Sequence, residues 1–381
     1  ESDDAAYAAL DVETLAAWLE RRLPVATSRE LHVVLDVAYR GEFGLETDEQ
    51  SALNLVYLLG LETDAFRVFG DSDERWHVHT GNDSYFSELA ALLPEGTLAL
   101  EHRLVAARGS GPFSLTFATP DGEHTVEVDK VVFALPFSIL RELDTADLTL
   151  SAEKREIIDT LGYGTNAKVM AGFSRPVWRE DHGALGTITT DLPLQQSWDT
   201  SLGQDGSTAI LTNFLGGQAG LDVADGTAEE WVTSVTLPGL DEIYPGAAAA
   251  YTTGSAVLMH WPTVPTQKGS YTCYRPGQWA FWSLEGEREG DLHFCGEHTS
   301  ADFQGWMEGG AESGERVASE ILDDLGVELP SSLQRRAELQ RLLPPIRRER
   351  RNALRVLRAR RAVYGAWARR RREGTATRRG S

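Results

Sequence analysis

The chain carries FCGEHTSADFQGWMEGGAESGERVASEIL at residues 294–322, where an apolar strand pattern gives way to a glycine-rich helix pattern. The strand, Asp291 to Cys295, delivers Gly296 and then Glu297 at its end. A glycine there lets a ligand approach the backbone closely, and a carboxylate accepts hydrogen bonds from hydroxyl groups. The pair therefore indicates a site for a sugar or a ribityl chain.

The helix predicted from Gly305 to Leu322 has a stripe of small residues, Gly310, Gly314 and Ala318. Each glycine in a helix costs about 1 kcal/mol relative to alanine, so the stripe favours a helix that lies close to a sheet or a cofactor. The free N–H groups at its N-terminus suit a group that becomes anionic. From the glycine spacing alone, an ordinary close-packed helix is the preferred interpretation.

Composition describes a globular chain with two oppositely charged parts. Its 381 residues are 41% hydrophobic without a long uncharged run, so it can bury a sizeable core and does not span a membrane. The last 51 residues contain 17 Arg and 3 acidic residues, whereas the first 330 contain 19 basic and 55 acidic residues. An acidic body repels nucleic acid, so only the tail could bind a polyanion, and a solvated tail is the simpler expectation.

Two cysteines, Cys273 and Cys295, lie in apolar segments without metal-ligand spacing. We expect buried thiols and no metal site, and neither a metal cluster nor a catalytic triad is visible in the sequence.

The hydrophobic pattern changes its period along the chain. Residues 12–60 have the three- and four-residue spacing of helices, with Thr47 and Gln50 as a capping signal. Residues 96–135 alternate between short strands and turns, which predicts an antiparallel meander. Residues 151–262 mix strand candidates such as AKVMAGF and AILTNFL with one helix near TAEEWVTSVTL, so we expect a mixed sheet there.

The combination GEHTS…QGWMEGGAESG resembles the second flavin fingerprint of the flavin-containing amine oxidase family, which includes monoamine, polyamine and L-amino-acid oxidases. The resemblance runs from about Val12 to Leu322. It implies an α/β (mixed α+β) fold, in which an incomplete FAD-binding Rossmann-like domain carries an inserted mixed-sheet substrate domain. The implied parts are a helical part of the substrate region (1–60), the first part of the FAD-binding domain with the meander (61–140), the substrate-binding domain (141–262), the second part of the FAD-binding domain (263–326) and an Arg-rich tail (327–381).

The resemblance also implies five cofactor contacts. Gly296 and Glu297 would lie near the ribityl and pyrophosphate groups, and the amide of Met307 would lie near the flavin pyrimidine oxygen. Trp261 would pack on the flavin, and the backbone near Leu104 would contact adenine.

Three residues resemble the family's catalytic positions. Lys168, in GTNAKVMAGF, resembles the lysine that holds a water at flavin N5, although a strand lysine taken alone is usually just solvated. Tyr271 and Trp306 would flank the amine with their ring faces. Some family members attach FAD through a cysteine at the position of Ser270, and a serine cannot form that thioether. The resemblance therefore implies non-covalent FAD.

The implied reaction is oxidation of a small-molecule amine or amino acid to an imine, with O2 as acceptor. It releases H2O2, an aldehyde or keto acid, and ammonia. No Arg is clearly placed to bind a substrate carboxylate, so the substrate stays open. The alternatives are an L-amino-acid oxidase or a related flavin desaturase, and a non-catalytic degenerate lobe that acts as an interaction protein through its basic tail.

The family's first fingerprint, a GxGxxG turn between a strand and a helix, is not found in this sequence. The near match GYGTNA, residues 162–167, leads into a strand pattern. We therefore expect a fragment of a longer oxidase, or one chain of a two-chain enzyme, whose partner is the missing segment or a second copy. The cellular location stays open, with the cytoplasm favoured.

Overall fold

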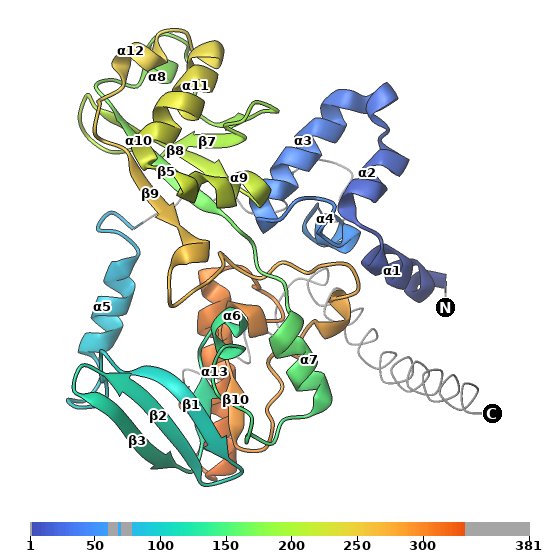
Figure 1. Cartoon of the computed structure of the whole chain (residues 1–381), viewed down its shortest axis with the longest axis vertical. Helices are drawn as coiled ribbons and strands as arrows, with labels where there is room; N and C mark the ends of the chain where they lie inside the picture. Colours follow the sequence, from blue (N-terminus) through green and yellow to red (C-terminus); the bar gives the residue numbers. More distant parts are fainter. Residues whose placement is uncertain (1, 60–67, 70–77, 332–381) are drawn as a thin grey trace. The chain divides into compact units, whose positions relative to one another are not determined.

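The computed structural model describes residues 2–59, 68–69 and 78–331 (Figure 1). The described residues belong to two compact units, one within residues 10–313 and one that includes residues 2–9 and 314–331. The larger unit contains every predicted site residue. None of the helices in the described ranges is both long and apolar enough to cross a membrane. The Arg-rich tail lies outside the described residues from position 332 onward.

The N-terminal part is helical, as its periodicity predicts. The helices are α1 (Ser2–Val12), α2 (Leu15–Arg22), α3 (Val25–Phe43) and α4 (Ala52–Leu59). Leu15, Leu19 and Tyr39 are fully buried in a shared apolar cluster of α2, α3 and α4. Thr14 begins α2 by accepting a hydrogen bond from the amide of Ala17, because a side-chain oxygen satisfies an amide that has no partner within the helix.

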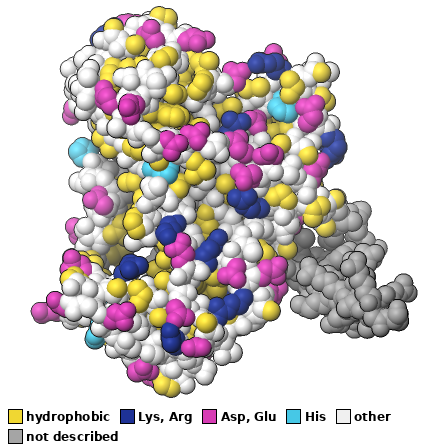
Figure 2. All heavy atoms as spheres, in the orientation of Figure 1, with side chains coloured by type: hydrophobic (Ala, Val, Ile, Leu, Met, Phe, Trp, Pro, Cys, Tyr) yellow, Lys and Arg dark blue, Asp and Glu magenta, His cyan; other side chains and the backbone are white. Residues whose placement is uncertain are grey.

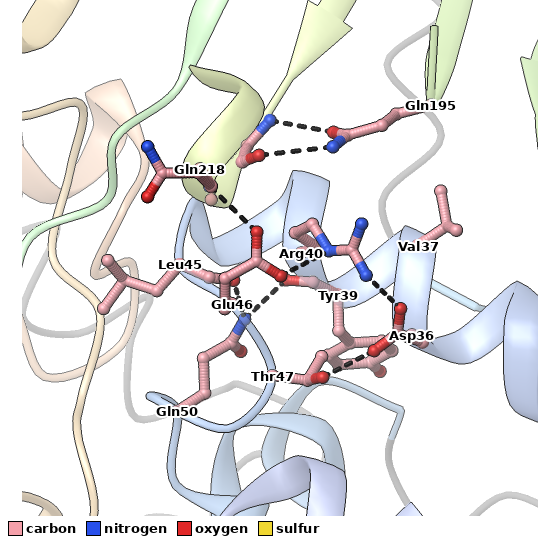
Figure 3. A network of polar contacts seen from close by, with 12 residues as sticks. Asp36, Val37, Tyr39, Arg40, Leu45, Glu46, Thr47, Gln50, Gln195 and Gln218 are labelled. Carbon is pink, nitrogen blue, oxygen red and sulfur yellow. Dashed lines mark hydrogen bonds and ion pairs between the residues drawn. The ribbon is translucent and has the colours of Figure 1, made fainter. Parts of the chain in front are cut away.

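The side chains of Thr47 and Gln50 do not form a capping box, which corrects the predicted signal, although their backbone carbonyls accept from the amides of Ala16 and Leu15 at the start of α2, each at 2.9 Å. Thr47 Oγ1 instead donates to Asp36, and the fully buried Gln50 donates through Nε2 to the carbonyls of Tyr39 (3.0 Å) and Leu45 (2.7 Å) (Figure 3). The two side chains tie the end of α3 to the turn that follows it. A capping pattern and a turn-fixing pattern are indistinguishable in the sequence, because both need a short polar side chain near a helix end.

Four strands follow α5 (Asp83–Ala91). The strands β1 (Arg103–Gly109), β2 (Phe113–Thr119) and β3 (Gly122–Val128) form the predicted antiparallel meander. The fourth strand, β4 (Val131–Phe133), leaves the meander and pairs in parallel with β10 (Leu292–Phe294), the strand before Gly296. Phe133 and Phe294 stack with their ring centroids 5.7 Å apart and are buried. A chain segment of more than 150 residues, with α6 (Phe137–Leu140) and α7 (Ala152–Thr160) at its start, separates these paired strands.

The middle of the chain forms a five-stranded sheet in the order β6-β7-β8-β5-β9. Its strands are β5 (Ala167–Phe173), β6 (Ile188–Thr189), β7 (Gln196–Asp199), β8 (Ala209–Leu215) and β9 (Val257–His260). Every pairing in it is antiparallel, so the expected mixed sheet is corrected to an antiparallel one. The strands β5 and β8 coincide with the predicted AKVMAGF and AILTNFL.

The two faces of β5 have different environments. Ala167, Val169, Ala171 and Phe173 are buried on one face, in an apolar cluster with residues of the helical segments. Those segments are α8 (Val177–Glu180), α9 (Gly217–Asp222), α10 (Ala228–Trp231), a π-helix (Val232–Thr236), α11 (Leu237–Ile243) and α12 (Ala247–Ala250). The opposite face is partly exposed and carries Lys168. Alternation therefore directs the lysine away from the apolar core.

The helical part and the five-stranded sheet are joined by polar contacts around Glu46 (Figure 3). Its carboxylate forms an ion pair with Arg40 of α3 at 3.0 Å and accepts a hydrogen bond from the amide of Gln218 at 2.8 Å. Gln218 lies in α9, which follows β8. Figure 2 shows acidic and basic side chains interspersed over one face of the described residues.

Candidate active site

The segment just before β5 pairs with the segment that carries Ser270 and Tyr271. The amide of Gly164 donates to the carbonyl of Tyr271 at 2.8 Å, and the amide of Ser270 donates to the carbonyl of Gly164 at 2.9 Å. A Cβ at Gly164 would lie 2.5 Å from Ser270 Oγ. This glycine of GYGTNA therefore serves close backbone packing, and the segment leads into a strand as expected.

Ser270 and Tyr271 are both fixed by hydrogen bonds that reach α3. Ser270 Oγ donates to Asn166 Oδ1 at 2.6 Å, and the buried Asn166 donates through Nδ2 to the carbonyl of Gly41 at 2.7 Å. The Tyr271 hydroxyl donates to the same Gly41 carbonyl at 3.3 Å. The ring of Tyr271 is thereby held on a rigid support, which is what an aromatic wall of a binding site requires.

Glu297 joins the Tyr271 segment to the turn before Trp306. Its Oε1 accepts from the amide and the hydroxyl of Thr272, at 3.1 and 3.0 Å. Its Oε2 accepts from the amide of Gly305 at 2.6 Å. Burial raises the pKa of Glu297, and the hydrogen bonds from Gly305 and Thr272 oppose that shift. The carboxylate thus bridges two segments 33 residues apart in the sequence.

Gly296 gives the end of β10 a conformation that other residues rarely adopt. Its φ is +129°, and a Cβ there would lie 2.6 Å from the ring of His298. Its amide donates to Ser313 Oγ at 2.9 Å, and Ser313 Oγ donates in turn to the Gly296 carbonyl at 3.0 Å. The strand end is therefore fastened to the helix α13 (Met307–Asp324), which corresponds to the helix predicted from Gly305 to Leu322.

Trp306 and Met307 lie at the start of α13 with exposed fractions of 37% and 54%. Asn82 Nδ2 approaches Met307 Sδ at 3.6 Å. The close approach within this turn occurs at Gly309, where a Cβ would lie 2.2 Å from the carbonyl of Phe303. At Gly310, which belongs to the predicted stripe, a Cβ would meet no described atom within 4 Å.

Lys168 lies over two aromatic rings that the sequence pattern does not identify. Its Nζ is 5.7 Å from the ring centroid of Trp198 on β7 and 5.6 Å from that of Phe214 on β8. The two rings are themselves 5.3 Å apart. Ring faces attract an ammonium group, so the pair holds the lysine over the partly exposed face of the sheet.

Trp261 is connected to this face through β9. It follows His260, whose register partner on β5 is Ala167, the residue before Lys168. The predicted adenine contact, Leu104, is half-buried in β1 of the meander. The hydrogen bonds described above link Tyr271 to the Trp306 turn and to the entry of β5, and they do not include Leu104.

Cys273 and Cys295 are buried thiols, as their apolar surroundings predict. Burial raises the pKa of the Cys273 thiol, which leaves it a poor nucleophile.

A sequence model of the family described as "Flavin containing amine oxidoreductase" matches residues 7–322. Among curated proteins, YobN of Bacillus subtilis (strain 168), whose name proposes an L-amino-acid oxidase, is 32% identical over 197 residues, covering 51% of this chain and 41% of YobN. Flavin-containing amine oxidase A of Equus caballus is 25% identical over 274 residues, covering 70% of this chain and 50% of that protein. The chain thus spans half or less of the length of these two relatives.

Two solved structures share the fold. Cyclohexylamine oxidase from Brevibacterium oxydans IH-35A has a TM-score of 0.68 at 21% identity, covering 84% of this chain and 69% of that one. Wild-type putrescine oxidase bound to putrescine has a TM-score of 0.69 at 20% identity, covering 83% and 69%. The match to the family's sequence model over residues 7–322 shows that this chain belongs to the flavin-containing amine oxidoreductase family.

Proposed function

We propose that this chain is the whole or a part of an FAD-dependent oxidase that converts an amine or amino acid into an imine. The substrate carbon loses a hydride and the nitrogen a proton; O2 takes up two electrons and two protons to give H2O2. Water then hydrolyses the imine to an aldehyde or keto acid and ammonia. The observation that carries the proposal is the Glu297 bridge, which joins the segment of Tyr271 to the turn of Trp306.

When bound, FAD supplies the two-electron acceptor for this reaction. The residues at the start of α13 fit such a group. A Cβ at Gly310 would enter open space among the described residues. The first amides of an 18-residue helix are natural donors to anionic oxygens. Gly296, Glu297, Met307 and Trp261 would hold the cofactor in this proposal, with Leu104 near its adenine.

We propose that FAD is held without a covalent bond. Ser270 stands where some family members have the attaching cysteine, and its hydroxyl is engaged with Asn166. Acid precipitation of the flavin-loaded full-length protein should leave the flavin in the supernatant, whereas flavin that pellets with the polypeptide would contradict the proposal.

The substrate would lie between Tyr271 and Trp306, whose rings orient the amine. Lys168, whose ammonium group lies over the rings of Trp198 and Phe214, would hold a water molecule next to the flavin. Similar proteins are named for putrescine, cyclohexylamine and L-amino acids. L-amino-acid oxidation is the second candidate, favoured by the 32% identity to YobN. The comparisons lend no support to a non-catalytic interaction protein.

A peroxide assay of the full-length, FAD-loaded protein tests the proposal. The panel should contain putrescine, cyclohexylamine, an aromatic monoamine and the common L-amino acids. We expect one class to give H2O2 and imine-derived product in equal amounts, with D-amino acids as a stereochemical control. A protein that binds FAD and releases no peroxide with any member of the panel would contradict an oxidase function.

A further inference from the structure

A buried carboxyl group, Glu285, begins a hydrogen-bond chain that ends at the turn before Trp306. Glu285 is 0% exposed, and its Oε1 accepts from the hydroxyl of Tyr274 at 2.5 Å. The Tyr274 oxygen accepts from Gln304 Nε2 at 2.9 Å. Gln304 directly precedes Gly305 and Trp306 in the sequence. None of these contacts involves the residues to which a catalytic or cofactor role has been given above.

The direction of each hydrogen bond in this chain is fixed. Burial raises the pKa of Tyr274 well above its usual value, with the charge of Glu285 acting in the same direction. Tyr274 therefore keeps its proton and donates a hydrogen bond to Glu285. Gln304 Nε2 is a donor only, and it also donates to the carbonyl of His298 at 3.2 Å. The order is Gln304 to Tyr274 to Glu285, with the carboxyl group as the final acceptor.

The surroundings of Glu285 favour a carboxyl group that changes its protonation near neutral pH. Among the described residues, Oε2 has no hydrogen-bond partner. The buried Lys154 Nζ donates to the backbone carbonyls of Leu284 (2.6 Å) and Glu285 (2.8 Å). Burial raises the pKa of Glu285 to about 7, while hydrogen bonds from Tyr274 and from the backbone of Glu285 and Ser283, together with the charge of Lys154, partly oppose the shift.

Two further tyrosines interact electrostatically with the residues of this hydrogen-bond chain. Tyr57 acts electrostatically on Tyr274, and Glu285 acts on the buried Tyr163. Tyr163 is not part of the hydrogen-bond series from Gln304 to Glu285. Its hydroxyl oxygen accepts from the amide of Phe137 at 2.8 Å. Glu297 holds the other side of the same turn through the Gly305 amide. Two carboxyl groups thus hold adjacent residues of one turn, and only Glu285 does so through a relay.

We propose that Glu285 is a positioning residue, and that gain or loss of its proton changes how firmly the turn carrying Trp306 is held. An ionised carboxylate makes a stronger hydrogen bond with Tyr274, which polarises the hydroxyl and strengthens its bond from Gln304. A protonated carboxyl group makes a weaker one, so the turn is held mainly by Glu297. The inference rests on the proposed function only where it assigns Trp306 to the amine site.

Fluorescence of Trp306 tests the relay without turnover. The Trp306 signal is obtained by subtracting the emission of the Trp306→Phe protein from that of the parent protein across pH 5.5 to 8.5. We expect a transition with a midpoint near pH 7 in the parent protein. It should disappear in Glu285→Gln, and in Tyr274→Phe, which removes only the hydroxyl. Each variant is paired with its own Trp306→Phe subtraction.

Two controls complete the test. Glu123→Gln, at an exposed position of β3, should keep the parental transition. Gln304→Met, at a partly exposed position, should abolish the transition. A transition that persists in Glu285→Gln or in Gln304→Met, or a parent protein without one, would overturn the proposal. The fluorescence measurements need no amine. A protein that lacks oxidase activity but shows all the expected transitions would therefore contradict the proposed function and support the proposed role of Glu285.

Discussion

Glu297 Oε2 accepts a hydrogen bond from the amide of Gly305 at 2.6 Å, while Oε1 of the same carboxylate accepts from Thr272. One side chain just after β10 thereby fixes both the segment of Tyr271 and the turn of Trp306. The two aromatic residues proposed to face the substrate are thus positioned by a group that need not touch the substrate.

Glu297→Gln should weaken the bridge. An amide nitrogen would replace one acceptor oxygen and face a backbone or hydroxyl donor, so one buried donor loses its partner. We expect a loss of about 1–3 kcal/mol in the free energy of unfolding of the chain, measured by urea denaturation. The exposed Glu127→Gln on β3 is the matched control. Equal stability of both variants and the parent would refute the bridge.

Gly309→Ala and Gly310→Ala should have opposite effects although the residues are neighbours. A Cβ at Gly309 would lie 2.2 Å from the carbonyl of Phe303, so we expect a loss of about 1–3 kcal/mol. A Cβ at Gly310 meets no described atom within 4 Å, so alanine should gain up to about 1 kcal/mol from helix propensity. In the full-length protein Gly310→Ala should nevertheless weaken FAD binding, measured by flavin fluorescence; unchanged affinity would remove Gly310 from the cofactor site.

Lys168→Met should slow the half-reactions of the full-length enzyme and leave amine binding nearly unchanged. Methionine keeps the contact with Trp198 and Phe214 and removes the ammonium group that would hold a water. We expect flavin reduction or reoxidation to slow by at least about tenfold, which corresponds to about 1.4 kcal/mol of activation free energy. Met170→Leu, on the same face of β5, is the control. Parental rates of both half-reactions in Lys168→Met would make the lysine a structural strand residue.

Trp306→Ala should weaken amine binding and also slow flavin reduction. The ring is 37% exposed, so its removal leaves little of the core unfilled, and misplaced reacting atoms cost both affinity and rate. Rapid mixing of the full-length enzyme over a range of amine concentrations separates the two effects. Trp306→Phe, which keeps a ring, should lie between the parent and the alanine variant. Unaltered kinetics in Trp306→Ala would exclude this ring from the amine site.

Glu285→Gln should change how the stability of the chain depends on pH. Burial raises the pKa of Glu285 from 4.5 to about 7, so the folded protein binds this proton more tightly than the unfolded chain does. The contribution of Glu285 to stability therefore falls as pH rises from 4.5 to 7, by up to about 3 kcal/mol, and is constant above that. Urea denaturation at pH 5 and pH 8 should show the variant gaining about 1–3 kcal/mol relative to the parent at the higher pH. If the free energy of unfolding changed with pH in the same way in Glu285→Gln and in the parent protein, the raised pKa of Glu285 would be contradicted.

The fold is predictable from sequence where a strand has one apolar face. AKVMAGF matches β5 because its buried residues alternate with partly exposed ones. AILTNFL matches β8 with a less regular pattern, because Thr212 and Asn213 are adjacent and both buried. The strand β7 is not predictable in this way. Its sequence is QSWD, and Gln196 is buried by hydrogen bonds to backbone carbonyls of α3, at 3.3 and 3.5 Å. The pattern of hydrophobic residues cannot predict that a polar side chain such as Gln196 is buried, because its burial depends on hydrogen bonds to a distant segment.

Some residues of the candidate site are likewise predictable from the sequence and others are not. Gly296, Glu297 and Trp306 belong to one continuous motif, so the sequence predicts them together as site residues. The sequence pattern does not point to Thr272 or Glu285, because their importance comes from contacts with residues distant in the sequence. The only signal for Glu285 is an acidic residue beside the apolar run AFWSL.

Anaerobic mixing of the full-length, FAD-loaded protein with its amine tests the central claim most directly. The visible absorbance of oxidised flavin should bleach in one turnover, in proportion to imine formed, and return on addition of O2 with release of one H2O2 per flavin. Trp306→Ala should slow this bleaching, and Lys168→Met should slow either the bleaching or the return of the absorbance with O2. Flavin that stays oxidised with every amine and amino acid tested would contradict the account.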